Sequence, residues 1–127
     1  MKNASIAQMT IRGAGVLQLI LGFIVWSGKT SYLVPVHILI GSILVVALLA
    51  LCTLTWRSGV SKWLVILTVL WALILPVWGI SQGALMKHLP GSSAWIIPVS
   101  HLLCGVGAIG LAEMMGGQMK KKTASPA

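Results

Sequence analysis

The hydropathy pattern divides this chain into four long apolar stretches, separated by short segments that carry nearly all of the charged residues. A helix crosses the hydrocarbon core of a bilayer with about 20 apolar residues. The pattern therefore predicts four transmembrane helices, at about residues 5–27, 33–55, 61–83 and 94–116, followed by a short basic tail at residues 117–127. Because the first apolar stretch is short, its predicted helix reaches back to Ser5, and the side chain of Arg12 is expected to extend to the headgroups.

The predicted connections are short and contain Gly, Ser, Lys and Pro, which favour turns. Short connections make consecutive helices antiparallel neighbours. We therefore expect an all-α integral membrane protein, folded as a single domain (residues 1–127) with the topology of a four-transmembrane-helix up-down bundle. Aromatic residues at the predicted helix ends fit the belts found at membrane interfaces. They are Trp26, Tyr32 and Trp95 at one boundary, and Trp56 and Trp63 at the other.

The composition excludes an ordinary soluble domain. Hydrophobic residues make up 57% of the chain and charged residues only 8%, and the mean hydropathy is +0.99. The first apolar stretch also has loose features of a secretory signal, but no A-x-A-like cleavage site follows it. We therefore expect the first helix to remain part of the protein.

The charged residues are distributed unevenly. Nine Lys and Arg residues against one acid give a net charge of +8, and in a four-span arrangement only Lys29 and Lys87 fall on one side. The other seven mark the cytoplasmic side by the positive-inside rule. We therefore expect a multi-pass protein of the inner (cytoplasmic) membrane with both termini in the cytoplasm. The basic tail would also touch anionic lipid of the bilayer, and no pattern indicates nucleic-acid binding.

Two histidines, His37 and His101, lie inside predicted helices in similar local sequences. Each follows a proline by two or three residues, and each precedes a glycine, Gly41 or Gly105, by four. Both fall five or six residues after a boundary aromatic, so they should lie level, about 8–9 Å below the outer boundary. Ionisable residues are costly in a bilayer and usually functional. The matching segments also predict two similar helical hairpins related by a pseudo-twofold axis.

Two neutral imidazoles on facing helices suit the two axial positions of a haem iron. We therefore predict one haem b (iron protoporphyrin IX) per chain, with His37 and His101 as the iron ligands. Gly41 and Gly105 would lie one turn deeper on the same helix faces, where a missing side chain lets a wide ring approach. Alternatively, each histidine bonds to a neighbouring helix and the glycines serve packing alone. A metal ion without porphyrin is disfavoured because zinc sites usually use three or four ligands.

Tryptophan and cysteine pairs add two weaker expectations. Trp71 and Trp78 share one face of the third predicted helix, where they either stack beside a porphyrin or, as we favour, pack against a neighbouring helix. Cys52 and Cys104 should differ in depth by about 18 Å, which is too far for a disulfide.

The remaining polar residues fall near the two boundaries. Glu113, the only acid, is expected near the cytoplasmic boundary, either paired with Arg57 or Lys62 or serving a proton or quinone site. Three basic residues in the outer connections could meet haem propionates or stay solvated. They are Lys29, Lys87 and His88.

Several of these positions resemble the haem A synthase family. One hairpin of that family is similar to Leu17–Gly22 with Val25, Gly28, Pro35 and His37, and another, more loosely, to residues 77–83 with Pro98, His101 and Leu102. The resemblance covers most of residues 17–112 and implies a single four-helix bundle holding haem between two histidines. The glutamate that the family's catalytic half carries one turn before a histidine has no counterpart before His37 or His101, and its external cysteine pair is absent.

Together these features predict a small membrane b-type cytochrome that transfers electrons near the outer face. Its partner would be quinol, a redox protein or the other subunits of a respiratory complex. No catalytic residue is predicted, and whether the chain is an enzyme stays open. The alternatives are a haem A synthase-like enzyme and a haem-free structural or transport subunit. The small residues Gly13 with Gly15, and Gly105 with Ala108, would permit a homodimer or a larger complex.

Overall fold

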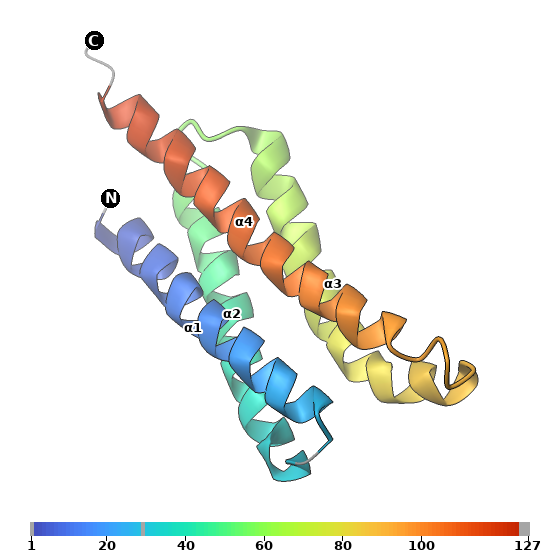
Figure 1. The fold of residues 1–127 in the computed structure, drawn as a ribbon. Coiled ribbons are helices and arrows are strands. Elements are labelled where there is room, and N and C mark those ends of the chain that lie inside the picture. Colours follow the sequence, from blue (N-terminus) through green and yellow to red (C-terminus); the bar gives the residue numbers. More distant parts are fainter. Residues whose placement is uncertain (1, 29, 125–127) are drawn as a thin grey trace.

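The computed structural model describes residues 2–28 and 30–124, and every long element in this part of the chain is a helix (Figure 1). The elements are α1 (Lys2–Trp26), the short 3-10 helix η1 (Ser31–Leu33), α2 (Val34–Thr55), α3 (Lys62–His88) and α4 (Ile96–Ala124). The four α-helices are each long and apolar enough to cross a membrane. The predicted all-α class and four candidate spans are therefore confirmed.

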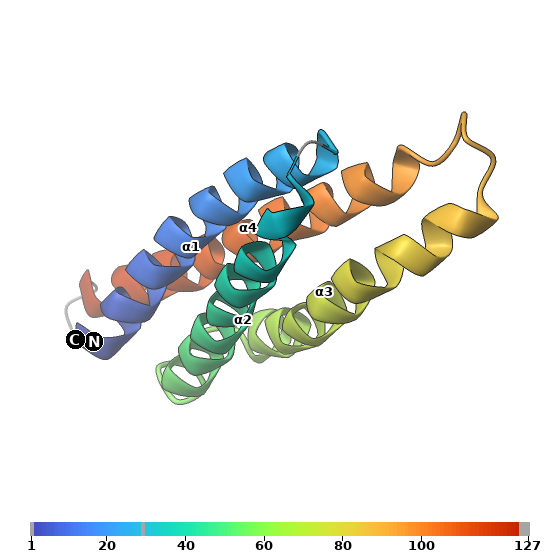
Figure 2. The ribbon, with the colours of Figure 1, turned by 90° about the horizontal axis from the view of Figure 1, so that it is seen from below.

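The four helices pack in a ring. Helix α1 contacts α2 and α4, and α3 contacts the same two neighbours, so that α1 and α3 stand diagonally. Figures 1 and 2 show the first turn of α1, the α2–α3 connection and the last turn of α4 toward one end of the molecule. At the opposite end, the tips of the α1–α2 and α3–α4 hairpins lie apart in both views. We call these the terminal end and the hairpin end.

A closed core fills only the terminal half of this ring. The buried residues of α1 end at Gly15 and those of α3 end at Leu75, whereas those of α2 begin at Leu44. The larger side chains with at most 1% of their surface exposed include Ile11, Leu44, Leu48, Leu51, Val65 and Met115. In a bilayer such close packing, rather than the exclusion of water, holds helices together.

The hairpin half is open by comparison. Beyond Gly15, Leu75 and the equivalent levels of α2 and α4, Ile97 is the one buried residue in the described chain. Pro76 follows Leu75 directly and lies inside α3, so the carbonyl of Ala72 loses its usual helical donor at the level where the closed core ends. The two hairpins therefore separate where the buried residues stop.

Two helices end later in the chain than the sequence predicted. Helix α3 continues to His88 and ends at Leu89, whose extended conformation (φ −99°, ψ 144°) is the one that a following proline imposes. Helix α4 continues to Ala124, so the predicted tail at 117–127 is helical over most of its length. Lysine is a good helix former, and Lys121 and Lys122 in the last turn complement the helix dipole.

Glycines allow α1 and α4 to approach closely. A Cβ on Gly15 would come within 2.6 Å of Ile109 Cδ1, and one on Gly116 would collide with the side chain of Gln8. By contrast, a Cβ on Gly13 or Gly105 would meet no heavy atom within 4 Å. Of the small residues expected at a dimer contact, Gly15 is therefore already used within the bundle.

Candidate functional site

His37 from α2 and His101 from α4 face one another in the open half of the bundle. Their ring centroids are 6.3 Å apart and their planes are inclined by 58°. Each histidine is seven residues from the first residue of the closed core on its own helix, Leu44 or Ala108. The pair therefore lies about 10 Å beyond the core, at one level of the bundle.

Each imidazole rests against a glycine of the preceding helix. A Cβ on Gly22 of α1 would stand 3.5 Å from Cε1 of His37, and one on Gly79 of α3 would stand 3.0 Å from Cε1 of His101. In both hairpins, therefore, a histidine of the second helix contacts a glycine of the first. The 3.5 Å at Gly22 is an ordinary van der Waals distance, whereas a Cβ on Gly79 would require the ring of His101 to shift by a few tenths of an ångström.

Gln18 is the polar neighbour of the pair. Its Nε2 lies 3.0 Å from Nε2 of His37, and the amide can donate this bond when the ring carries its proton on Nδ1. Nδ1 of His37, Nδ1 of His101 and Oε1 of Gln18 are buried and have no hydrogen-bond partner within the described chain. Three such atoms at one place are unusual because an unpaired buried polar group costs free energy.

The separation of the two rings fits ligation of one metal atom from both sides. Two metal–nitrogen bonds of about 2.0–2.1 Å, with about 1.2 Å from each nitrogen to its ring centre, put trans imidazole centroids about 6.4 Å apart. The observed 6.3 Å is close to this separation, and the two ring planes are inclined by 58°. Ligation through Nε2 of His37 requires that this atom leave Gln18.

A metal ion held by protein ligands alone does not fit this place. Among the described residues, no group of three or more His, Cys, Asp or Glu side chains could hold a metal ion. A porphyrin supplies four nitrogens of its own, so two histidines are the full protein contribution to a six-coordinate haem iron. The donor set of His37 and His101 therefore matches haem better than a bare ion.

The glycines four residues after each histidine take different positions. Gly41 lies against the amide of Gln18, where a Cβ would stand 2.8 Å from Nε2, and Gly105 meets no heavy atom within 4 Å. Their expected part in binding a ring stays a prediction. The glycines in contact with the imidazoles, Gly22 and Gly79, precede the histidines by 15 and 22 residues. In the sequence these two glycines stand out only as part of Leu17–Gly22 and residues 77–83, the segments that resemble haem A synthase hairpins.

Both tryptophans of α3 are tied to α4 beside the pair. Trp71 Nε1 donates to the carbonyl oxygen of Cys104 at 2.8 Å, and Trp78 Nε1 donates to Oγ of Ser100 at 3.2 Å. Packing against the neighbouring helix, the favoured expectation for these residues, is therefore confirmed. Because Ser100 and Cys104 flank His101, the two bonds also fix the turn of α4 that carries it.

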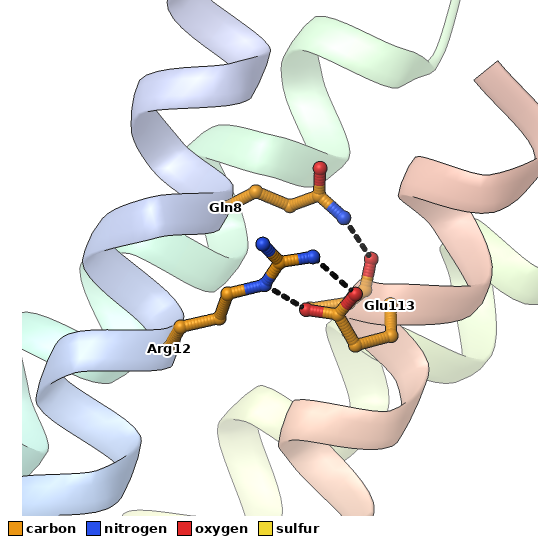
Figure 3. Close-up of polar contacts among 4 residues, drawn as sticks. Gln8, Arg12 and Glu113 are labelled. Carbon is orange, nitrogen blue, oxygen red and sulfur yellow. Dashed lines mark hydrogen bonds and ion pairs between the residues drawn. The ribbon is translucent and has the colours of Figure 1, made fainter. Parts of the chain in front are cut away.

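The single acid has a partner that the sequence did not predict. Arg12 of α1 donates from Nε to Oε1 of Glu113 at 2.5 Å and from Nη2 to Oε2 at 2.7 Å (Figure 3). Pairing of Glu113 with Arg57 or Lys62 was therefore wrong, and Arg12 spans to α4 instead of extending to headgroups. Spacing along one helix could not show this because the contact joins α1 to α4. The pair lies about 18 Å from the level of His101.

Within the described part of the chain, the other residues singled out by the sequence make no contact with the two imidazoles that would add a ligand. Cys52 and Cys104 are both free, as expected. Lys87 and His88 are exposed in the last turn of α3, at the hairpin end, and Lys29 lies outside the described residues.

Comparison with known proteins adds no assignment. No protein-family model, no curated protein and no solved structure matches this chain. The resemblance to haem A synthase hairpins stays a prediction, and the histidine pair is interpreted from its own geometry.

Proposed function

We propose that this chain is a small membrane cytochrome of the b type, which holds one haem b between His37 and His101. The observation that carries the proposal is the facing of the two imidazoles, 6.3 Å apart, in the open half of the bundle. When bound, the haem supplies reversible one-electron chemistry. Two strong axial ligands leave no open coordination position, which favours electron transfer over oxygen binding.

The surrounding residues have distinct parts in this proposal. Gly22 and Gly79 set the distance of each imidazole from the neighbouring helix, and Trp78 steadies the turn of α4 before His101 through Ser100. Gln18 would release Nε2 of His37 and move off Gly41, so that Gly41 and Gly105 leave space below the histidines. Lys87 and His88 are exposed at the hairpin end and would form a basic rim suited to carboxylates directed outward. The sequence adds Lys29 to this proposed rim.

The proposed setting is the inner membrane, crossed four times in up-down order with both termini cytoplasmic. The terminal end gathers Lys2, Arg57, Lys62 and the Lys120–Lys122 run, which supports this orientation through the positive-inside rule. One haem near the outer face cannot carry electrons across the remaining bilayer. It would therefore exchange electrons at the outer side, with quinol or a redox protein, or beside other redox centres of a complex.

Visible spectroscopy tests the ligand assignment. The protein, expressed with ample haem and purified in detergent, should show a Soret band and a low-spin reduced-minus-oxidised spectrum. His37→Ala and His101→Ala should each abolish the low-spin form or convert it to high spin. The third histidine provides a control for iron ligation: His88 is exposed beyond the pair and would meet only the outward carboxylates, so bound haem in His88→Ala should keep its low-spin spectrum. Parent-like spectra in both ligand variants would overturn the proposal.

A haem-free role is the second candidate, favoured by the hydrogen bond between Gln18 and His37. In that role the pair packs α2 against its neighbours or passes protons as part of a structural or transport subunit. Absence of a Soret band in protein expressed with ample haem would favour it. A haem A synthase-like activity would instead yield a chemically altered porphyrin when the protein is offered haem, which mass analysis of the extracted pigment detects.

A further inference from the structure

A cavity of about 510 Å³ opens at the terminal end of the bundle, far from the histidine pair. Its polar lining comes from three parts of the chain. Lys2, Ser5 and Gln8 contribute from α1, Ser58 from the α2–α3 connection, and Lys120 and Lys122 from α4. Three lysines, two serines and one glutamine therefore border one cavity, together with Gly116 and Met119.

No carboxylate side chain lines this cavity, and the composition explains why. The only acid of the sequence is Glu113, and both of its oxygens are bonded to Arg12. Lys120 also lies within electrostatic reach of that carboxylate, whereas Lys2 and Lys122 have no second acid to meet. A cavity with excess positive charge attracts anions, and lysine is a common ligand of phosphate.

The far end of α4 is held in place, so the cavity has a defined wall. Oε1 of Gln118 accepts a hydrogen bond from the backbone N–H of Ser61 at 2.9 Å, which joins α4 to the start of α3. Lys122 lies over the turn between α2 and α3, where a Cβ on Gly59 would stand 2.8 Å from Nζ. At the inner side of the cavity, Gln8 donates to the carbonyl oxygen of Ala112 at 3.3 Å (Figure 3).

From this arrangement we infer that the terminal cavity binds a phosphate group, with Lys2 and Lys122 as its principal ligands and Ser5 as a hydroxyl partner. Two sources share this chemistry, the headgroup of an anionic phospholipid and free phosphate. The cavity lies beside the ends of helices that can span a membrane, at the level where headgroups would stand. Phosphate binding here does not depend on haem at the histidine pair.

Lipid retention in detergent tests the inference. The purified protein is mixed with equal amounts of phosphatidylglycerol and phosphatidylcholine, and the bound lipid is counted by native mass spectrometry. The parent should retain one phosphatidylglycerol in preference. Lys2→Gln combined with Lys122→Gln should weaken that binding by about 30-fold, about fivefold for each lysine. The matched control, Arg57→Gln combined with Lys121→Gln, removes two charges from the same end outside the lining and should change it less than about threefold.

A second variant guards against a folding defect. Ser5→Asp adds a negative charge to the cavity in the first turn of α1, where an acid favours the helix, and it should also abolish the preference. Competition with inorganic phosphate separates the sources: displacement at millimolar concentration identifies a free anion, and retention of the lipid identifies the headgroup. Equal retention of both lipids by the parent, or equal losses in the two double variants, would overturn the inference.

Discussion

Gly79 of α3 lies directly against the imidazole of His101 on α4, so close that a Cβ on the glycine would stand 3.0 Å from Cε1 of the ring. The position of the ring is thus limited by the backbone of a neighbouring helix. Gly105, one turn beyond His101 on the same helix, meets no heavy atom within 4 Å. Alanine variants at these two positions therefore allow a comparison. Both remove a glycine from a helix, but only the one at Gly79 disturbs the contact with the ring.

Exchanging each of these glycines for alanine should give opposite results. Gly105→Ala removes a flexible residue from a helix and should stabilise the protein by about 0.5–1 kcal/mol. Gly79→Ala receives the same stabilisation from the loss of a flexible residue, but it forces the ring of His101 to shift. Its thermal unfolding midpoint should therefore stay below that of Gly105→Ala. Unfolding in detergent, followed by circular dichroism, measures both. Equal midpoints for the two variants, measured without haem, would contradict the contact between Gly79 and the ring of His101.

How far the sequence predicts the fold depends on what each residue contacts. The four helices were predictable because charge-free apolar runs depend on local composition alone, as in the stretch that holds Leu44 and Leu48. The ends of the helices were less predictable. The continuation of α4 beyond residue 116, for example, involves the contact of Gln118 with Ser61. The residue pattern of α4 does not show where the start of α3 lies in space, so this contact could not be predicted.

Gln18 should affect the two states of the histidine pair differently. In protein without haem, Gln18→Leu removes the hydrogen bond to His37 and should lower the free energy of unfolding by about 1 kcal/mol. Haem affinity should be unchanged or higher, because Nε2 of His37 no longer has a competing partner. Chemical unfolding and haem titration measure the two quantities. Gln82→Leu is the matched control, since Gln82 bonds only to the carbonyl of Gly79 in its own helix. A tenfold loss of haem affinity in Gln18→Leu alone would mean that Gln18 positions the ligand.

The equal level of the two histidines in the bundle was predictable from the sequence, but their neighbours were not. The equal level of His37 and His101 follows from counting residues along helices with a fixed rise. That Gly22 and Gly79, and not Gly41 and Gly105, touch the rings depends on how each helix is rotated toward the next. Rotation is set by side-chain packing between helices, which a single sequence does not display.

The ion pair of Arg12 and Glu113 should show strong coupling between its partners. Both side chains are partly exposed, at 52% and 40%, on helices that can span a membrane, so removing one leaves the other charge unpaired near lipid. Arg12→Gln and Glu113→Gln should each lower the thermal stability in lipid nanodiscs more than the double variant does. Additive losses in the double variant would mean that the pair contributes nothing as a pair. Lys87→Gln, at the exposed end of α3, should leave the stability unchanged.

The contact of Gln118 with Ser61 makes the last turns of α4 part of the folded bundle. Gln118→Ala removes the acceptor for the backbone N–H of Ser61 while keeping a strong helix former, so the loss should reflect that hydrogen bond, about 1 kcal/mol. Gln118→Glu retains an acceptor oxygen and should keep the parent stability. Hydrogen exchange of the amide of Ser61 provides a local readout, with faster exchange in Gln118→Ala and parent-like exchange in Gln118→Glu. Unchanged exchange in both variants would mean that α4 does not dock on the start of α3.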